Sequence, residues 1–280
     1  RSPSRIVPPV RGSGATGRVG SGWTCQSAGV SGWEAVLVVL AGVGAGGVNA
    51  VIGSGTLITF PTILAVGYDP VVANVSNNIG LVPGSAFGAY GFRRELEGQG
   101  GRARTLALAS GSGGLTGGIL LLTLPSDVFD AVIPVLVLLA CALMVVQPRL
   151  AAWVAGRRAE DARDVGPAPM AIAYLAGIYG GYFGAAQGVI LLAMLAVFVP
   201  DDLKRSNALK NVLAGTVNAV AAVLFIVFAE VAWEVVALVA VGSAVGGTLG
   251  AKVGRRIPPT ILRALVVALG VFVAVRLFLD

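Results

Sequence analysis

The chain has 280 residues, of which 56% are hydrophobic and 12% are charged, with a net charge of +6 and a mean hydropathy of +0.85. Soluble domains carry about 25% charged residues, so this composition excludes an ordinary soluble protein. The sequence contains no histidine, which excludes histidine-based acid–base catalysis and the usual histidine metal sites.

Residues 1–32 are rich in Ser, Gly and Arg and contain no acidic residue, which predicts a disordered N-terminal tail. Apolar runs follow, each near the roughly 20 residues that a helix needs to cross a bilayer. They cover residues 33–52, 71–92, 105–124, 128–146, 170–187, 207–229, 232–251 and 261–279. The pattern predicts an all-α polytopic membrane protein.

Two further apolar segments, 56–67 and 189–199, are too short to span, because about a dozen helical residues cover only ~18 Å of a ~30 Å hydrocarbon core. Each follows a glycine-containing break, Gly53-Ser54-Gly55 in the first case and Gln187-Gly188 in the second. Interrupted short segments at corresponding places in two halves of a chain are typical of a transporter's binding site.

The apolar part of the chain is an internal repeat, since residues 44–147 align without a gap on residues 177–280 after a shift of 133 positions. Asn74 then matches Asn207, and Asn78 matches Asn211. Membrane transporters are often built from two such repeats, with the binding site where they meet. The sequence predicts a first transmembrane repeat at 33–147, a cytoplasmic linker at 148–168 and a second repeat at 169–280.

The loop charges predict how the repeats face. Lys and Arg concentrate in 93–104, 149–163, 204–205 and 252–256, whereas 68–70, 125–127 and 230–231 carry none. The positive-inside rule makes the first set cytoplasmic and the second external. Corresponding spans then run in opposite directions, which predicts inverted repeats of five segments, with each break region either crossing twice or dipping in and returning. The basic loops follow membrane topology and do not indicate nucleic-acid binding.

Glycine has two readings in these spans. At Gly44, Gly47, Gly113, Gly117, Gly180, Gly181, Gly246 and Gly250 we interpret it as a means of close helix packing. At the two breaks, the recurrence of the interruption favours a binding site, in which open backbone amides face an anion. The predicted site residues there are Gly53, Ser54, Gly55, Thr56, Gln187 and Gly188.

Amide side chains open the long run after each break. Asn74 and Asn78, like Asn207 and Asn211, are four residues apart and share a helix face. We add these four, with Asn77 and Lys210, to the predicted substrate site. As alternatives, the first amide of each pair is an N-cap and Lys210 extends to the membrane surface. Asp69 and Asp202 are expected to be turn or N-cap residues.

The stretch Ala41-Gly42, Gly53-Ser54-Gly55-Thr56-Leu57-Ile58, Pro61, Ala73-Asn74 and Asn77-Asn78, with its second Gly-rich copy, resembles the TauE/SafE permeases. The resemblance covers about residues 33–280. The breaks carry less glycine than is usual for this family. The resemblance implies movement of sulfite, sulfonates or related organic anions across the cytoplasmic membrane, coupled to an ion gradient.

The residues by themselves predict a secondary transporter, with amides, open backbone and one lysine around a small anion in the lipid bilayer. Neither a Walker-type motif nor a cofactor motif is present. An intramembrane enzyme would need a nucleophile with a base or a metal, which these spans do not offer, so we predict no enzymatic activity. The alternative is a structural or partner-binding membrane protein without transport, against which the costly burial of paired amides argues.

Overall fold

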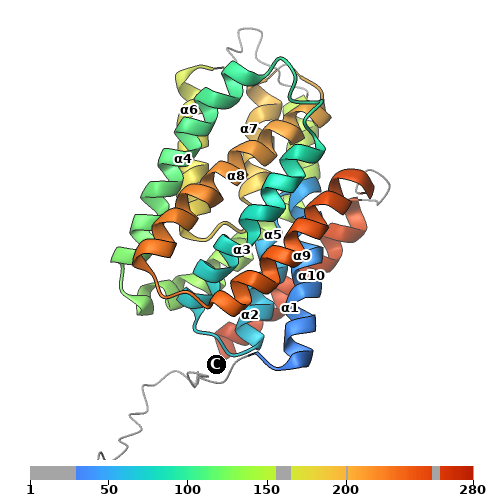
Figure 1. Ribbon diagram of the computed structural model, residues 1–280. Helices are drawn as coiled ribbons and strands as arrows, with labels where there is room; N and C mark the ends of the chain where they lie inside the picture. Colours follow the sequence, from blue (N-terminus) through green and yellow to red (C-terminus); the bar gives the residue numbers. More distant parts are fainter. Residues whose placement is uncertain (1–29, 156–164, 200, 254–258, 280) are drawn as a thin grey trace, which may run out of the picture.

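The computed structural model describes residues 30–155, 165–199, 201–253 and 259–279 (Figure 1). The predicted tail up to residue 29, and the predicted basic loops at 156–163 and 254–256, lie outside these residues. The described residues form ten helices and no strand. The long helices are α1 (Gly32–Val51), α3 (Pro70–Gly91), α4 (Gly100–Thr123), α5 (Ser126–Ala155), α6 (Pro167–Tyr182), α8 (Leu203–Phe228), α9 (Trp233–Val253) and α10 (Pro259–Leu279).

The two short segments form α2 (Thr56–Ala65) and α7 (Gln187–Phe198), helices of 10 and 12 residues. Among the described residues, five helices are long and apolar enough to cross a membrane: α1, α4, the first part of α5, α8 and α9. The predicted all-α polytopic fold is confirmed. Helix α5 continues to Ala155, into the segment that the sequence assigned to the linker.

Helices α3 and α8, which come after the short helices, start at aspartates. Asp69 accepts a hydrogen bond from the Val71 backbone at 3.0 Å, and Asp202 accepts one from the Arg205 backbone at 2.7 Å. The predicted N-cap role of both aspartates is confirmed. The alternative that Asn74 and Asn207 are caps is wrong, because each lies more than a turn inside its helix. Helix α8 begins at Leu203, before the predicted apolar run 207–229, whose start hydropathy places too late because the first turn of the helix contains the charged residues Lys204 and Arg205.

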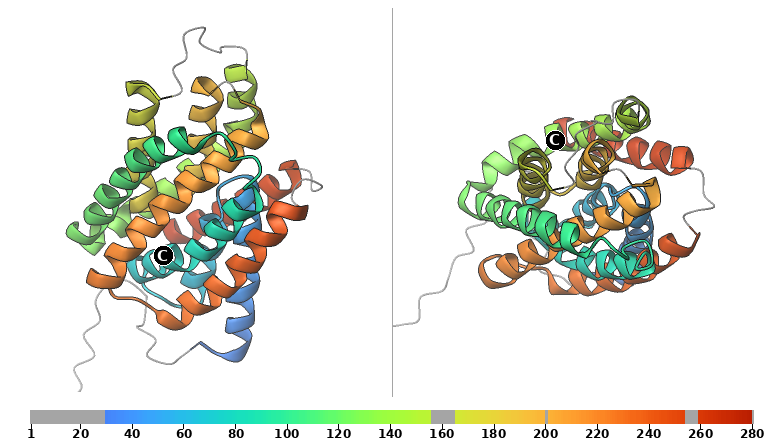
Figure 2. Two further views of the ribbon diagram at one scale, coloured as in Figure 1. Left: turned by 45° about the horizontal axis from the view of Figure 1, so that its top comes forward. Right: turned by 90° about the horizontal axis from the view of Figure 1, so that it is seen from above.

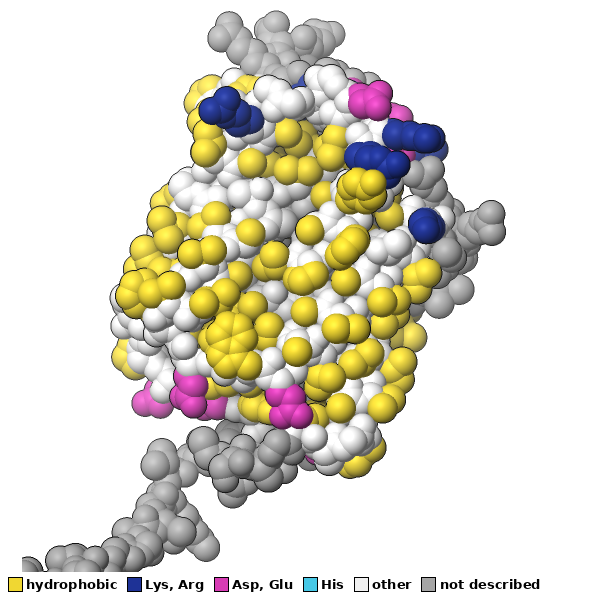
Figure 3. Space-filling model, viewed as in Figure 1, with side chains coloured by type: hydrophobic (Ala, Val, Ile, Leu, Met, Phe, Trp, Pro, Cys, Tyr) yellow, Lys and Arg dark blue, Asp and Glu magenta, His cyan; other side chains and the backbone are white. Residues whose placement is uncertain are grey.

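Charge divides the bundle into two ends. We call the end with the α3–α4 connection and the start of α8 the basic end, and the end with the α2–α3 and α8–α9 connections the acidic end. On the face in Figure 3, Lys and Arg gather at the former and only Asp and Glu at the latter, with apolar side chains between. Helices α3, α5 and α9 run from the acidic end to the basic end, whereas α4, α8 and α10 run the other way (Figure 1).

The two halves of the chain interleave, as the views in Figure 2 show. Helix α1 packs on α9, and the corresponding α6 packs on α4. Likewise α3 packs on α9 as α8 packs on α4. Most of the close contacts that hold the bundle together therefore join one half to the other, which makes the junction between the halves the core of the molecule.

Glycine permits these close contacts. A Cβ on Gly113 of α4 would collide with the carbonyl oxygen of Tyr174 on α6, and one on Gly246 of α9 would collide with that of Val43 on α1. The close-packing interpretation is confirmed for Gly113, Gly117, Gly181, Gly246 and Gly250. It is wrong for Gly44, where an added Cβ would make only ordinary contacts with the Ile58 side chain, whereas Gly47 lies against Gly246 and Gly250 of α9.

Candidate functional site

The two breaks turn back at mid-length of the bundle. Helix α1 starts and α2 finishes at the acidic end, while α6 starts and α7 finishes at the basic end (Figure 1). Each break region therefore starts and finishes at the same end of the bundle, with a longer helix before the break and a shorter one after it. The turns use left-handed backbone at equivalent positions, with φ of 88° at Gly53 and 58° at Ala186.

The two breaks touch each other through their backbones. The Gly188 amide donates a hydrogen bond to the Gly53 carbonyl oxygen at 3.1 Å. A Cβ on Gly188 would lie 2.5 Å from the Gly53 Cα, so no larger residue fits without displacing the chain. The predicted break residues of both halves are therefore brought together at one point.

Helix α8 holds the end of α1. Asn207 and Asn211 donate from Nδ2 to the Ala50 carbonyl oxygen at 3.0 and 3.2 Å, and Lys210 donates from Nζ to the Asn49 carbonyl oxygen at 3.0 Å. The last carbonyls of a helix have no intrahelical donor and lie at the negative end of its dipole. The three side chains of the second half thus satisfy the terminal carbonyls that the first break leaves open.

Helix α3 satisfies the end of α6 in the same way, but with one side chain. Asn74 donates from Nδ2 to the Tyr182 carbonyl oxygen at 2.9 Å. Asn77, which corresponds to Lys210, turns to its own half instead. It donates to Thr56 Oγ1 at 3.4 Å and accepts from Thr59 Oγ1. Asparagines predicted from the sequence therefore form hydrogen bonds at both breaks.

Sequence reasoning missed Asn49 and Thr59. Asn49 receives Lys210 on its carbonyl and donates from its side chain to Ser85 Oγ at 3.3 Å. It is the one amide side chain in the apolar run 33–52, and this was the available signal. Thr59 carries no comparable signal, because a threonine in a short apolar helix commonly bonds its own backbone, as this one also does to Gly55.

All twelve predicted site residues are buried. Lys210 has an exposed fraction of 0%, so the alternative that it extends to the membrane surface is wrong: its stem runs inward from α8 to the end of α1. Four of the twelve have a buried polar atom without a hydrogen-bond partner, namely Ser54 Oγ, Asn78 Oδ1, Gln187 Nε2 and Asn207 Oδ1.

Two of these atoms occupy corresponding places. Ser54 and Gln187 lie 133 positions apart, so they are equivalent residues of the two breaks. Gly180 leaves the room for the Gln187 amide, with which a Cβ at that position would collide. Buried polar groups are normally paired, so the unpaired donors on both breaks are candidates to bind a ligand with hydrogen-bond acceptors.

Electrostatically the site is cationic. Lys210 is the only charged side chain among the buried residues that the structure describes. The N-termini of α2 and α7, which carry partial positive charge, begin at the breaks. Across the described ranges, no group of three or more Cys, Asp or Glu side chains could hold a metal ion. The arrangement suits a small anion.

At the basic end, an ionic latch joins the α3–α4 and α7–α8 connections. Asp201 lies between two arginines, at 2.5 Å from Arg102 Nη1 and 3.1 Å from Arg205 Nε. Arg205 also donates from Nη2 to the Glu97 carbonyl oxygen at 3.0 Å, and Gln99 donates to the Arg205 carbonyl oxygen at 3.4 Å. We call these five residues the latch.

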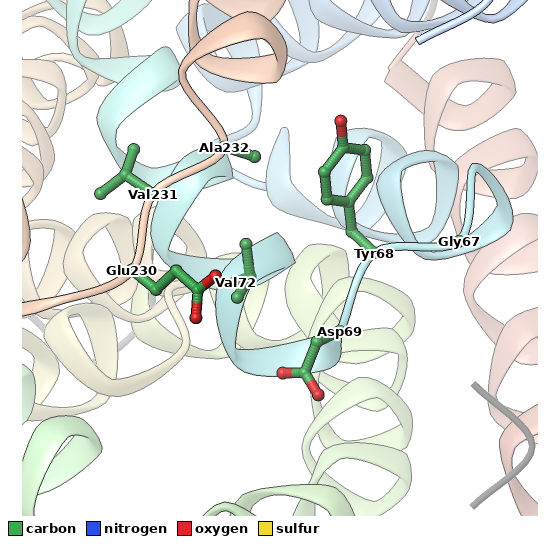
Figure 4. A pocket seen from close by; sticks show the side chains of 7 residues that line it. All are labelled: Gly67, Tyr68, Asp69, Val72, Glu230, Val231 and Ala232. Atoms are coloured by element: carbon green, nitrogen blue, oxygen red, sulfur yellow. The ribbon is translucent and has the colours of Figure 1, made fainter. Parts of the chain in front are cut away.

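At the acidic end, a cavity of about 160 Å³ separates the α2–α3 and α8–α9 connections. Its lining consists of Gly67, Tyr68, Asp69, Val72, Glu230, Val231 and Ala232 (Figure 4). Partial burial raises the pKa of the Tyr68 hydroxyl, and the nearby carboxylates of Glu234 and Glu34 raise it further. The cavity is thus an acidic opening next to the start of α3.

The fold and the central junction define a polytopic all-α membrane protein whose two halves meet at broken helices. The family model described as sulfite exporter TauE/SafE matches residues 38–277, so the chain belongs to this family. This confirms the resemblance read from the sequence.

Curated relatives are named as membrane transporters. The chain is 24% identical over 238 residues to the probable membrane transporter protein YfcA of Escherichia coli K12, covering 84% of this chain and 86% of the relative. It is 25% identical over 238 residues to the probable membrane transporter protein ORF9 of a Sinorhizobium species, covering 84% and 89%. No solved structure matches the chain at a comparable significance.

Proposed function

We propose that this protein is a secondary transporter for small anions, such as sulfite, sulfonates or related organic acids, in the cytoplasmic membrane. Its family and the names of its relatives support membrane transport. The observation that supports an anionic substrate is the meeting of two helix breaks, each with an unpaired buried donor, beside one buried ammonium group.

Six of the twelve central residues have distinct roles in this proposal. Asn74, Asn207 and Asn211 fix the ends of α6 and α1, which keeps the breaks open. Ser54 and Gln187, whose donors are unengaged, bind the oxygen atoms of the anion. Lys210 supplies the compensating charge and leaves the Asn49 carbonyl oxygen when the anion arrives. Because the contributing residues come from both halves, relative motion of the halves opens the site to one side and then to the other.

The two halves form inverted repeats in this proposal, with the basic end cytoplasmic and the acidic end external. The opposite directions of α3 and α8, and of α4 and α9, support it. Single cysteines at Gly98 and Ser126 test it in intact cells. A membrane-impermeant thiol reagent should label Ser126→Cys from outside and Gly98→Cys only from the cytoplasmic side. Labelling of both from one side would exclude the inverted arrangement.

Transport is tested with purified protein in liposomes, by uptake and efflux of sulfite, methanesulfonate, sulfate and a carboxylate. Ser54→Ala and Gln187→Leu should each lower apparent affinity about five- to a hundred-fold, since loss of one buried hydrogen-bonding group costs about 1–3 kcal/mol. Thr216→Val on α8 is the control, because its hydroxyl bonds the Val212 carbonyl oxygen of its own helix. If the wild-type protein transports none of these anions, the proposal is wrong.

A further inference from the structure

The unbalanced positive charge of Lys210 at the centre of the molecule determines which anions the site can accept. Lys210 is fully buried, and the one bond that its ammonium makes goes to the uncharged Asn49 carbonyl oxygen. The ion pairs of Asp201 with Arg102 and Arg205 lie in the latch at the basic end, and among the described residues the other buried side chains are uncharged. The centre therefore holds one positive charge that this part of the chain does not balance with a carboxylate.

A buried ammonium without a counter-charge is costly, and the carboxyl end of a helix offers only about half an elementary negative charge. The end of α1 therefore compensates Lys210 in part. The other helix ends at the breaks, the carboxyl end of α6 and the amino ends of α2 and α7, together add about half a positive charge, so one full negative charge on a ligand would balance the centre. A second negative charge on the same ligand would be left uncompensated in a site from which water is largely excluded.

The remaining donors at the junction are neutral. Ser54 and Gln187 have exposed fractions of 1% and 2%, and their Oγ and Nε2 atoms have no partner. Their breaks are linked to the helix end that Lys210 contacts, because Gly53 touches Gly188 and the Asn49 Cβ lies 3.2 Å from the place of a Cβ on Gly55. Such groups can bind oxygen atoms of a ligand without neutralising a further charge.

We infer that the substrate is a singly charged oxyanion, such as an alkyl sulfonate or hydrogensulfite, and that doubly charged anions such as sulfate are rejected. The inference rests on the anion transport proposed above and narrows its substrate class. The preference arises from one buried ammonium among neutral donors, so it follows the charge of the ligand and not the element at its centre.

Binding to the purified full-length protein tests this inference, with ligand-induced thermal stabilisation and calorimetry as readouts. Methanesulfonate keeps a single charge over the whole working pH range, whereas sulfate keeps two. Methanesulfonate should bind at least tenfold more tightly than sulfate. The affinity for total sulfite should fall as rising pH converts hydrogensulfite into the dianion, when it is normalised to that for methanesulfonate at the same pH. The comparison needs no variant.

Variants then assign the preference to Lys210. Lys210→Arg keeps the positive charge and should keep the preference for methanesulfonate. Lys210→Met should bind methanesulfonate at least tenfold more weakly. The control is Lys204→Met on the same helix, at an exposed lysine of the basic end, which should behave as wild type.

The outcomes separate the two proposals. Binding of sulfate and methanesulfonate within threefold of one another would overturn the charge inference and leave anion transport standing. Unchanged methanesulfonate binding in a folded Lys210→Met protein would overturn it as well. Failure of the wild-type protein to bind or move any of the anions would overturn the proposed function itself.

Discussion

The basic and acidic ends of the molecule are built from corresponding connections and differ in how these connections meet. At the basic end, the α3–α4 and α7–α8 connections are tied by Asp201 between Arg102 and Arg205. At the acidic end, the corresponding α8–α9 and α2–α3 connections stand around a cavity of about 160 Å³ (Figure 4). Ion pairs therefore join the connections at the basic end, whereas a cavity separates those at the acidic end.

The reason for this difference is visible in the repeat. A shift of 133 positions places Val235, Tyr68 and Val72 where the latch has Arg102, Asp201 and Arg205. The acidic end therefore lacks the charges from which a second latch could form. For the transport proposed above, we infer that the cavity is the mouth of the path in this state and that the latch must part to open the basic end.

The acidic lining of the mouth fits the inferred substrate charge. Asp69 and Glu230 line the cavity. Their repulsion of an approaching anion grows with the charge of that anion. A singly charged anion therefore meets about half the barrier that a doubly charged anion of the same size meets.

The contact between the two breaks serves both ends, so its loss should have the largest effect. Gly188→Ala places a Cβ 2.5 Å from the Gly53 Cα, and overpacking of backbone against backbone should cost about 3 kcal/mol of folding free energy. Thermal unfolding in detergent measures this loss. Gly44→Ala is the matched control, because its nearest neighbours would be side-chain atoms of Ile58 at 3.7 Å. Equal stability of both variants would show that the contact between the breaks does not stabilise the fold.

Closing the mouth should lower transport next most strongly. In Ala232→Trp, the indole would fill the cavity and block the path from the acidic end. Methanesulfonate flux in proteoliposomes should fall at least tenfold, which corresponds to about 1.4 kcal/mol, while thermal stability stays near that of wild type. Leu108→Trp on the exposed face of α4 serves as the control for an added indole. Wild-type flux in Ala232→Trp would place the path elsewhere.

Weakening the latch should have the smallest effect. Asp201→Asn removes both ion pairs of a partly exposed network, so folding stability should drop by only about 1 kcal/mol. The basic end should open more readily, with faster labelling of a cysteine at Gly98. Asp202→Asn is a close control, because an asparagine still caps α8. Slower labelling in Asp201→Asn than in Asp202→Asn would contradict the role of the latch.

Hydropathy, loop charge and the internal repeat predicted the helices, the short segments and the positions of the two breaks. They succeed because each depends on local composition or on a fixed register. The N-caps at Asp69 and Asp202 were predicted for the same reason, since an aspartate before a helix acts through its own neighbours.

What the sequence left open depends on contacts across the chain. Nothing local indicates that Lys210 points to the end of α1 or that Asn77 turns toward Thr56 and Thr59. The latch was missed as well. Its available signal was the set of charged positions, such as Arg102 and Asp201, that are charged in only one copy of the repeat.

The central claim is that the two ends open alternately around one site, and it is tested most directly by fastening the latch covalently. Arg102→Cys and Asp201→Cys, with Cys25 and Cys141 replaced by serine, are joined by a short reducible bifunctional thiol reagent. The control pair is Arg94→Cys with Gly98→Cys, which lies within one connection. Cross-linking of residues 102 and 201 should abolish methanesulfonate flux in proteoliposomes, and reduction should restore it, whereas the control pair should transport throughout. Undiminished flux through fully cross-linked protein would contradict the account.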